Sequence, residues 1–329
     1  MSASDLHDFW AWWLGRKDRL DEAIWAGTFD EQIDEITTAL GKVDERLGWE
    51  LAPGEESRNQ LIITAGGDPE VRPLARRLLA AAPDADEAWS YSDMRPPRSL
   101  DSGLLIGESE LVYGDATFIF KPNTHSMDIT IHHPLLASLP ASDQVQISFM
   151  ILDVAIGERA TELWIDAVDN SPRPLPNAHH ISELPAIVSQ LEGHVLEDGD
   201  MSWVVLEARG ADHPMFARKL ARLRSVLNPN FDTHVAVEVP YRGNEHGLPT
   251  ESAMRDLEKF EERLDEGMGS DGRLVVVETG GGRRTFHLYV DSTTAALGSI
   301  EHAAAEWKHG DANINYESDP GWHAVRHFG

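Results

Sequence analysis

Three histidines lie close enough together in the sequence to suggest a metal site. His125 comes shortly before His132 and His133, and imidazole nitrogen is a common ligand of zinc. If residues 127–132 form a strand, His132 and His133 point to opposite faces, so only one of them can join His125. The sequence places no acidic ligand beside them. We therefore interpret them as surface histidines.

Two further histidine pairs have spacings that are compatible with chemistry. His323 and His327 are four residues apart, and His179 is followed directly by His180. A zinc-protease motif needs a glutamate general base between its histidines, and His-Ala-Val-Arg-His has none. We expect these four residues to lie in an exposed tail and an exposed loop.

No established catalytic motif is present in the sequence. It has no nucleophile elbow, no phosphate-binding loop and no dinucleotide-binding fingerprint. Its 329 residues include no cysteine, which excludes thiolate nucleophiles, thiolate metal sites and disulfides. The sequence therefore predicts no catalytic residue, no metal ligand and no cofactor, although scattered carboxylates could still meet in space.

Two groups of arginines could bind an anion or an acidic partner. Arg283 and Arg284 follow three glycines, but a strand rather than a helix comes next, so the segment lacks the helix N-terminus that phosphate loops use. We interpret it as a hairpin turn with one arginine packed on the sheet. Arg218 and Arg222 belong to a basic run that pairs with neighbouring carboxylates or docks a partner.

An aspartate and a tryptophan stand out near the C-terminus. Asp319 precedes Pro-Gly-Trp, which is typical of a turn or a capping aspartate, and we expect Trp322 to anchor the tail. As candidate partner-binding residues we therefore select Arg283, Arg284, Arg218, Arg222 and Trp322.

Aromatic residues gather near the N-terminus, where they could form either a partner surface or a core. The cluster comprises Phe9, Trp10, Trp12, Trp13 and Trp25. Core packing is the preferred interpretation, because large aromatic side chains dominate protein cores.

The composition narrows the possible partners. A formal net charge of −28 at pH 7 repels nucleic-acid phosphates. The preferred interpretation of this charge is a solvated acidic surface, and the alternative is a surface for a basic protein partner. No apolar stretch is long enough to span a membrane, and the N-terminus does not resemble a signal peptide. We expect a cytoplasmic protein; its oligomeric state does not follow from the sequence.

Hydrophobic periodicity predicts an α+β protein with two domains, residues 1–195 and 200–329, separated by a polar stretch near residues 191–200. In the first domain we predict helices over residues 30–47, 142–156 and 181–191, with a capping box at Thr28 and Glu31. Its predicted strands cover residues 61–63, 117–120, 127–132 and 163–167.

In the second domain we predict a strand over residues 203–208 and a helix over residues 215–227. From Val235 onward the predicted order is β-α-β-β-α-β, the split pattern of ferredoxin-like domains.

The second domain resembles an uncharacterised bacterial family, the domain of unknown function six-nine-five. The matching residues are 247–250, Leu257-Glu258, 277–279, 282–286, Tyr289 and 319–322. The sequence departs from the family at its end, where it has Arg326-His327-Phe328-Gly329 in place of a Leu-Tyr-Pro run. The first domain resembles a recurrent uncharacterised bacterial module through residues 9–13, 62–66, 82–83, Trp89, 94–97, Leu152-Asp153 and Gly157-Glu158.

The second module is also similar to the regulator of ribonuclease E activity B, a small acidic ferredoxin-like protein that restrains a nuclease. This resemblance implies a non-enzymatic regulatory or protein-binding role, such as an inhibitor or immunity protein against a basic nuclease or toxin. The alternative is a hydrolase with a dispersed carboxylate and histidine site. A third interpretation is that one domain only supports the other or mediates dimerisation.

Overall fold

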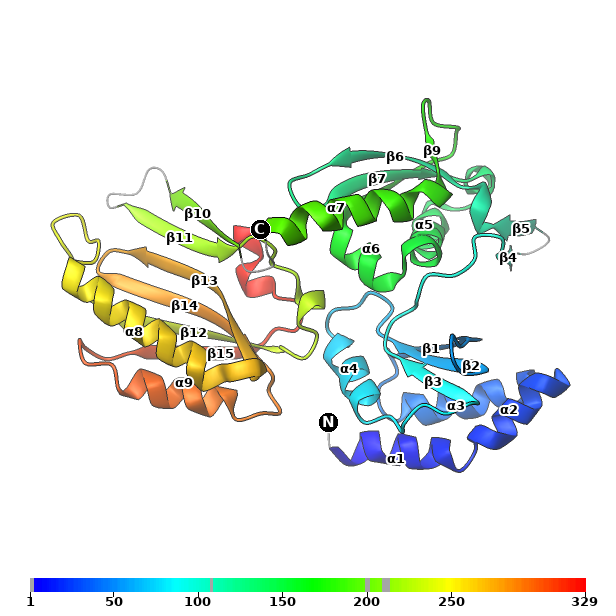
Figure 1. The fold of residues 1–329 in the computed structure, drawn as a ribbon, viewed down its shortest axis with the longest axis horizontal. Coiled ribbons are helices and arrows are strands. Elements are labelled where there is room, and N and C mark those ends of the chain that lie inside the picture. Colours follow the sequence, from blue (N-terminus) through cyan, green and yellow to red (C-terminus); the bar gives the residue numbers. More distant parts are fainter. Residues whose placement is uncertain (1–2, 107–108, 199–201, 209–213) are drawn as a thin grey trace. The chain divides into compact units, whose positions relative to one another are not determined.

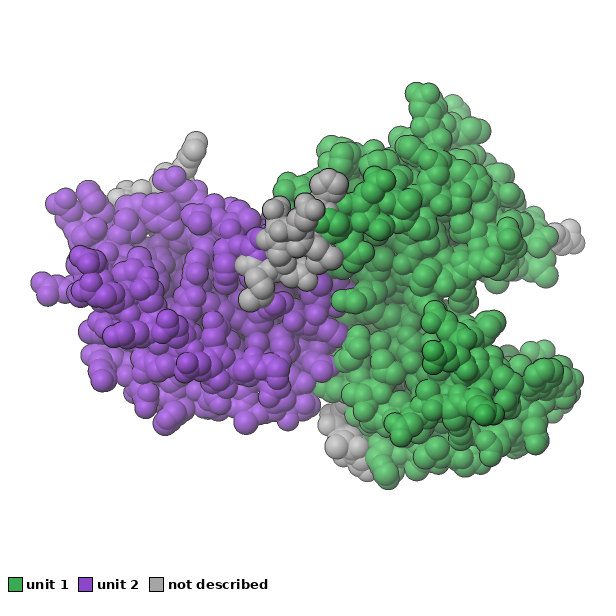
Figure 2. All heavy atoms as spheres, viewed as in Figure 1, with its two compact units in different colours: residues 1–197 green, residues 198–329 purple. Residues whose placement is uncertain are grey.

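The computed structural model describes residues 3–106, 109–198, 202–208 and 214–329. The chain divides into two compact units, residues 1–197 (unit 1) and 198–329 (unit 2), which Figure 2 colours differently. Both units combine α-helices with β-sheets (Figure 1), so the predicted α+β class is confirmed. Among the described residues, no helix is both long and apolar enough to cross a lipid bilayer.

Unit 1 begins with helices that accompany a three-stranded sheet. Its first elements are α1 (Ala3–Leu14), α2 (Lys17–Ala26), the 3₁₀ turn η1 (Phe29–Gln32), α3 (Ile33–Gly41), β1 (Gly48–Pro53), β2 (Asn59–Thr64), α4 (Arg72–Ala80) and β3 (Trp89–Ser92). β2 is antiparallel to β1 and parallel to β3, and α4 forms the crossover between the parallel strands. The carboxyl ends of β2 and β3 therefore lie at the same edge of the sheet.

The helix predicted over residues 30–47 is too long. α3 ends at Gly41, and the residues from Gly48 onward form β1, which the sequence did not indicate. The capping box was also wrong, because Thr28 makes no side-chain capping hydrogen bond. Pairing of residues 48–53 with residues 59–64 decides the conformation here, since tertiary context overrides local propensity.

The N-terminal aromatic cluster forms part of the core of unit 1. Phe9, Trp10 and Trp13 are at most 4% exposed, and the Trp10 indole donates to the Leu78 carbonyl at 2.9 Å. The core interpretation is confirmed for these three residues. Trp25 is different, because its side chain is 76% exposed.

The second part of unit 1 contains a hairpin and a four-stranded sheet. Its strands are β4 (Gly103–Ile106), β5 (Ser109–Val112), β6 (Thr117–Pro122), β7 (Met127–His132), β8 (Ile165–Ser171) and β9 (His179–His180), and its helices are α5 (Ala141–Ile156), α6 (Glu158–Trp164) and α7 (Leu184–Asp198). The sheet has the order β8-β7-β6-β9, with β7 and β8 parallel. α7 continues seven residues beyond the predicted end at Leu191, so that part of the expected boundary is helical.

Unit 2 is built on one six-stranded antiparallel sheet. Its strands are β10 (Trp203–Ala208), β11 (Met215–Leu220), β12 (Thr233–Pro240), β13 (Gly272–Gly280), β14 (Arg283–Val290) and β15 (Asn313–Ser318), in the order β10-β11-β13-β14-β12-β15. The helix predicted over residues 215–227 is wrong. Residues 215–220 form β11 and pair with both β10 and β13, and these backbone hydrogen bonds outweigh the helical spacing of the apolar residues.

The two faces of this sheet have different coverings. Helices α8 (Glu251–Met268) and α9 (Ala296–Ala305) lie on one face (Figure 1), where Leu257 and Phe260 pack against Val237 and Phe286. A C-terminal 3₁₀ segment, η7 (His323–Phe328), contributes to a smaller apolar cluster that includes Tyr289.

Candidate functional site

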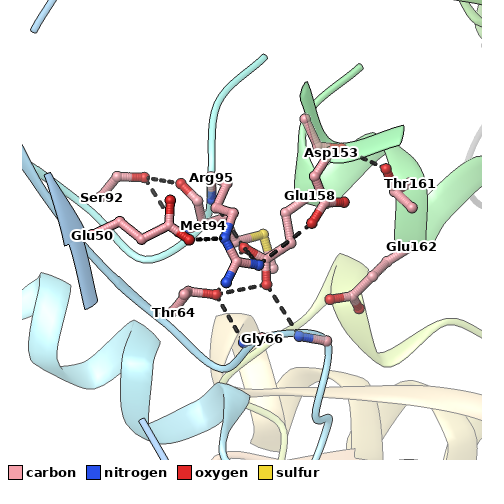
Figure 3. Close-up of polar contacts among 12 residues, drawn as sticks. Glu50, Thr64, Gly66, Ser92, Met94, Arg95, Asp153, Glu158, Thr161 and Glu162 are labelled. Atoms are coloured by element: carbon pink, nitrogen blue, oxygen red, sulfur yellow. Dashed lines mark hydrogen bonds and ion pairs between the residues drawn. The ribbon is translucent and has the colours of Figure 1, made fainter. Parts of the chain in front are cut away.

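Acidic and basic side chains of unit 1 meet near the carboxyl ends of β2 and β3 (Figure 3). Thr64 is the last residue of β2, and Arg95 lies three residues after the end of β3. Asp153 belongs to α5, and Glu158 begins α6. Ligands commonly bind at the carboxyl ends of parallel strands, so this cluster is the first candidate site.

Glu158 is the centre of the cluster and is only 3% exposed. The Thr64 hydroxyl lies 2.6 Å and 2.7 Å from its two carboxylate oxygens. The backbone N–H groups of Gly67 and Arg95 donate to these oxygens at 3.1 Å and 3.0 Å. Because both oxygens already accept hydrogen bonds from the chain, Glu158 joins three segments and is not free to act as a nucleophile.

Arg95 connects Glu158 to two further carboxylates. Its Nε donates to Glu50, and its Nη1 lies 3.4 Å from an oxygen of Asp153 and 3.7 Å from an oxygen of Glu158. Glu50 also accepts a hydrogen bond from Arg98 at 2.8 Å. One guanidinium thus partly neutralises three carboxylates, which limits their mutual repulsion in a half-buried setting.

Asp153 is the carboxylate of this cluster whose pKa is raised by its surroundings. Burial, and next the charge of Glu158, raise the pKa of Asp153 to about 6. A carboxyl group with such a pKa can exchange a proton near neutral pH, as general acids and bases do. The described residues contain no group of three or more histidine, aspartate and glutamate side chains that could hold a metal ion.

No sequence motif marks this cluster, because its members are far apart in the sequence. Its members belong to four separate stretches of the sequence, residues 62–66, 94–97, 152–153 and 157–158. The fold brings these four stretches together around the Glu158 carboxylate.

Unit 2 contains a second polar constellation, on the face of the sheet opposite α8 and α9. His287 Nε2 lies 2.9 Å from Glu278, and His287 Nδ1 lies 3.0 Å from His234 Nε2. In the neutral tautomer of His287 that donates Nε2–H to Glu278, Nδ1 accepts from His234 Nε2–H. Burial, and then the neighbouring His287, lower the pKa of His234 to about 4, and the His287 hydrogen bond lowers the pKa of Glu278.

Asp319 caps the C-terminal segment as the sequence predicts. Its carboxylate accepts the backbone N–H groups of His323 and Ala324 at 2.8 Å and 2.9 Å, and the Tyr289 hydroxyl at 2.5 Å. Trp322 is 3% exposed and stacks on Tyr289 with 4.4 Å between ring centroids. It therefore anchors the tail from within the core instead of presenting a surface.

The candidate arginines occupy different environments. Gly281 and Gly282 have φ values of 58° and 80° and form the hairpin turn, so the turn interpretation is confirmed. Arg283 is exposed and pairs with Glu238, whereas Arg284 is 7% exposed and packs on the sheet.

The two arginines of the basic run also differ. Arg218 pairs with Glu261, and its guanidinium lies 4.6 Å from the Trp203 ring centroid. Arg222 is 7% exposed. Arg218 and Arg283 thus remain near the surface, while Arg222 is buried.

The histidines of unit 1 do not form a joint site. His132 Nδ1 lies 3.0 Å from the Ser171 carbonyl, and His133 Nε2 lies 3.0 Å from the Val112 carbonyl. Both are buried, so the surface interpretation was wrong for these two, although His125 is half-buried. His323 and His327 are exposed, as expected.

The comparisons with known proteins concern the second unit. No curated protein and no solved structure matches the chain. A family model does match residues 201–328, and its description is a family of unknown function, DUF695. The predicted resemblance of the C-terminal half to this family is therefore confirmed.

Proposed function

We propose that the protein is a non-enzymatic binding protein whose acidic surface recognises a basic protein, such as a nuclease or a toxin. The observation that carries this proposal is a row of carboxylates on α8, formed by Glu258, Glu262 and Glu266. All three side chains are exposed, and none has a recorded ion pair with a described residue.

Like charges repel within this row, but Arg255, Lys259 and Arg263, each three residues before one of its glutamates, offset part of that repulsion. Residues four apart in a helix are neighbours, and like charges at this spacing destabilise it by roughly 0.2–0.5 kcal/mol per pair. Lysine or arginine side chains of a partner would add further attraction to these exposed carboxylates. An excess of acidic residues also accelerates the encounter with a basic partner.

We further propose that residues 233–318 form a ferredoxin-like unit. The strand order β13-β14-β12-β15, with α8 after β12 and α9 after β14, supports this assignment. The assignment, and the proposed similarity to the regulator of ribonuclease E activity B, agree with a binding role, although a fold alone does not define a function. The module resemblance of the first domain remains a proposal of the same kind.

The test is affinity capture from a native lysate at low and at high salt, with the captured proteins identified by mass spectrometry. We expect basic proteins that are released by salt, and we expect capture to fall when Glu258, Glu262 and Glu266 are all changed to Gln. The matched control changes three exposed acidic residues of unit 1, Glu45, Glu55 and Glu56, to Gln. Equal capture by both triple variants and the wild type would contradict the role of α8.

A hydrolase with a dispersed carboxylate site is the second candidate. It is favoured by one observation, the raised pKa of Asp153 beside Glu158 and Arg95. The test is a panel of ester, phosphoester and glycoside substrates with wild type and Asp153→Asn. Turnover that disappears in the variant would support the enzyme, whereas turnover that is equal in both proteins would remove Asp153 from any mechanism.

A further inference from the structure

Arg284 carries a buried positive charge to which no carboxylate of the described residues is directly bonded. The residue lies in β14, opposite Thr279 of β13, and its side chain is 7% exposed. Its Nε donates to the Thr279 hydroxyl at 2.9 Å, and its Nη2 lies 3.4 Å from the Met254 sulfur. For its Nη1 the structure records no partner among the described residues.

These contacts neutralise little of the charge. A hydroxyl is a neutral acceptor and a thioether sulfur is a weak one. Buried charges in proteins are normally paired, because removing an ion from water without a counterion is costly. Burial also lowers the pKa of Arg284, because the charged guanidinium is less stable away from water.

The acidic residue that acts most strongly on Arg284 is already bonded to another arginine. Glu261 makes its ion pair with Arg218, and the positive charge of Arg218 acts on Arg284 as well. Glu258 also attracts Arg284 through space, but its side chain is exposed. Glu261 is therefore bonded to Arg218 and acts on Arg284 only through space.

We propose that Arg284 is the anchor of a binding subsite for one oxyanion group, a carboxylate or a phosphate. A guanidinium presents its N–H groups in a planar fork that matches two oxygens of such a group. An anion at Nη1 would supply the missing counter-charge, and Arg218 would add attraction from β11, which β13 separates from β14. This inference goes beyond the proposed recognition of a basic protein, and the two sites share one residue, Glu258, which acts on Arg284 through space.

The experiment follows the Arg284 side chain by NMR in the full chain. Sodium phosphate, sodium acetate and sodium chloride are titrated separately at constant ionic strength, and the Arg284 Nε–H resonance is recorded. We expect a saturable shift with phosphate or acetate and none with chloride, and the anion that saturates at the lower concentration identifies the preferred group. A response that never saturates with either oxyanion, or one that chloride reproduces, would overturn the proposal.

Two variants localise the binding. The shift of the neighbouring backbone amides is expected to disappear in Arg284→Gln and to persist in Arg283→Gln, which alters an exposed arginine one position away. An unchanged amide response in a folded Arg284→Gln would also overturn the proposal. If this variant does not fold, the titration of the Arg284 resonance in the wild type still tests the proposal.

Discussion

Acidification is expected to destabilise unit 2 through one buried histidine. His234 is 6% exposed, and its pKa is lowered from 6.5 to about 4. Between these two pH values the unfolded chain binds a proton that the folded chain excludes. The free energy of unfolding therefore falls as the pH is lowered through this window, and the contribution of His234 reaches about 3 kcal/mol, since each pKa unit corresponds to about 1.4 kcal/mol.

The assay is urea unfolding of the full chain at pH 7, 5.5 and 4, with hydrogen exchange of β12 and β14 peptides to assign the transition to unit 2. His234→Gln keeps a side-chain N–H that can donate to His287 but cannot take up a proton near these pH values. We expect the variant to be less stable than the wild type at pH 7 and to lose less stability on acidification. The control is His302→Gln, whose histidine side chain is 81% exposed. An identical pH dependence in wild type and His234→Gln would refute the reasoning.

Three further perturbations address other contacts. The pKa of Asp153 is raised from 3.8 to about 6, so between these pH values the folded state binds more protons than the unfolded state. The wild type therefore loses stability as the pH rises through this range, whereas Asp153→Asn does not. We expect the stability of the variant relative to the wild type, measured by urea unfolding, to increase over the same range. Thr64→Val removes a hydroxyl donor from the buried Glu158 carboxylate and is expected to cost about 1–3 kcal/mol, measured by the same method; a loss within error would contradict the described role of Glu158. Tyr289→Phe leaves Asp319 without one donor and is expected to expose the C-terminal segment, so limited proteolysis near residue 323 is expected to accelerate relative to His302→Gln.

The sequence predicted best where local chemistry determines the structure. Three glycines predict a tight turn, and Gly281 and Gly282 adopt it because their φ values are positive. Asp319 predicts a cap, and it caps backbone N–H groups four and five residues ahead. Such features depend on a few neighbouring residues and can therefore be predicted from the sequence without knowledge of the fold.

The predictions were wrong where the local conformation depends on pairing with residues that are distant in the sequence. Residues 215–220 have apolar residues at helical spacing, yet strands on both sides impose an extended conformation. The Glu158 cluster was invisible to motif analysis because its contacts join residues more than 60 positions apart. One arginine of the turn was expected to pack on the sheet, but only the structure identifies it as Arg284 and shows that no carboxylate of the described residues is bonded to it.

The contacts of Glu158 also set an order of events during synthesis. The donor Thr64 is separated from its carboxylate by 94 positions, and the donor Gly67 by 91. At elongation rates of about 5–20 residues per second, the loop after β2 waits roughly 5–20 seconds for its acceptor to emerge from the ribosome. The first sheet therefore leaves the ribosome with an unfinished edge, which can close only after Glu158 has emerged, while unit 2 is still being synthesised.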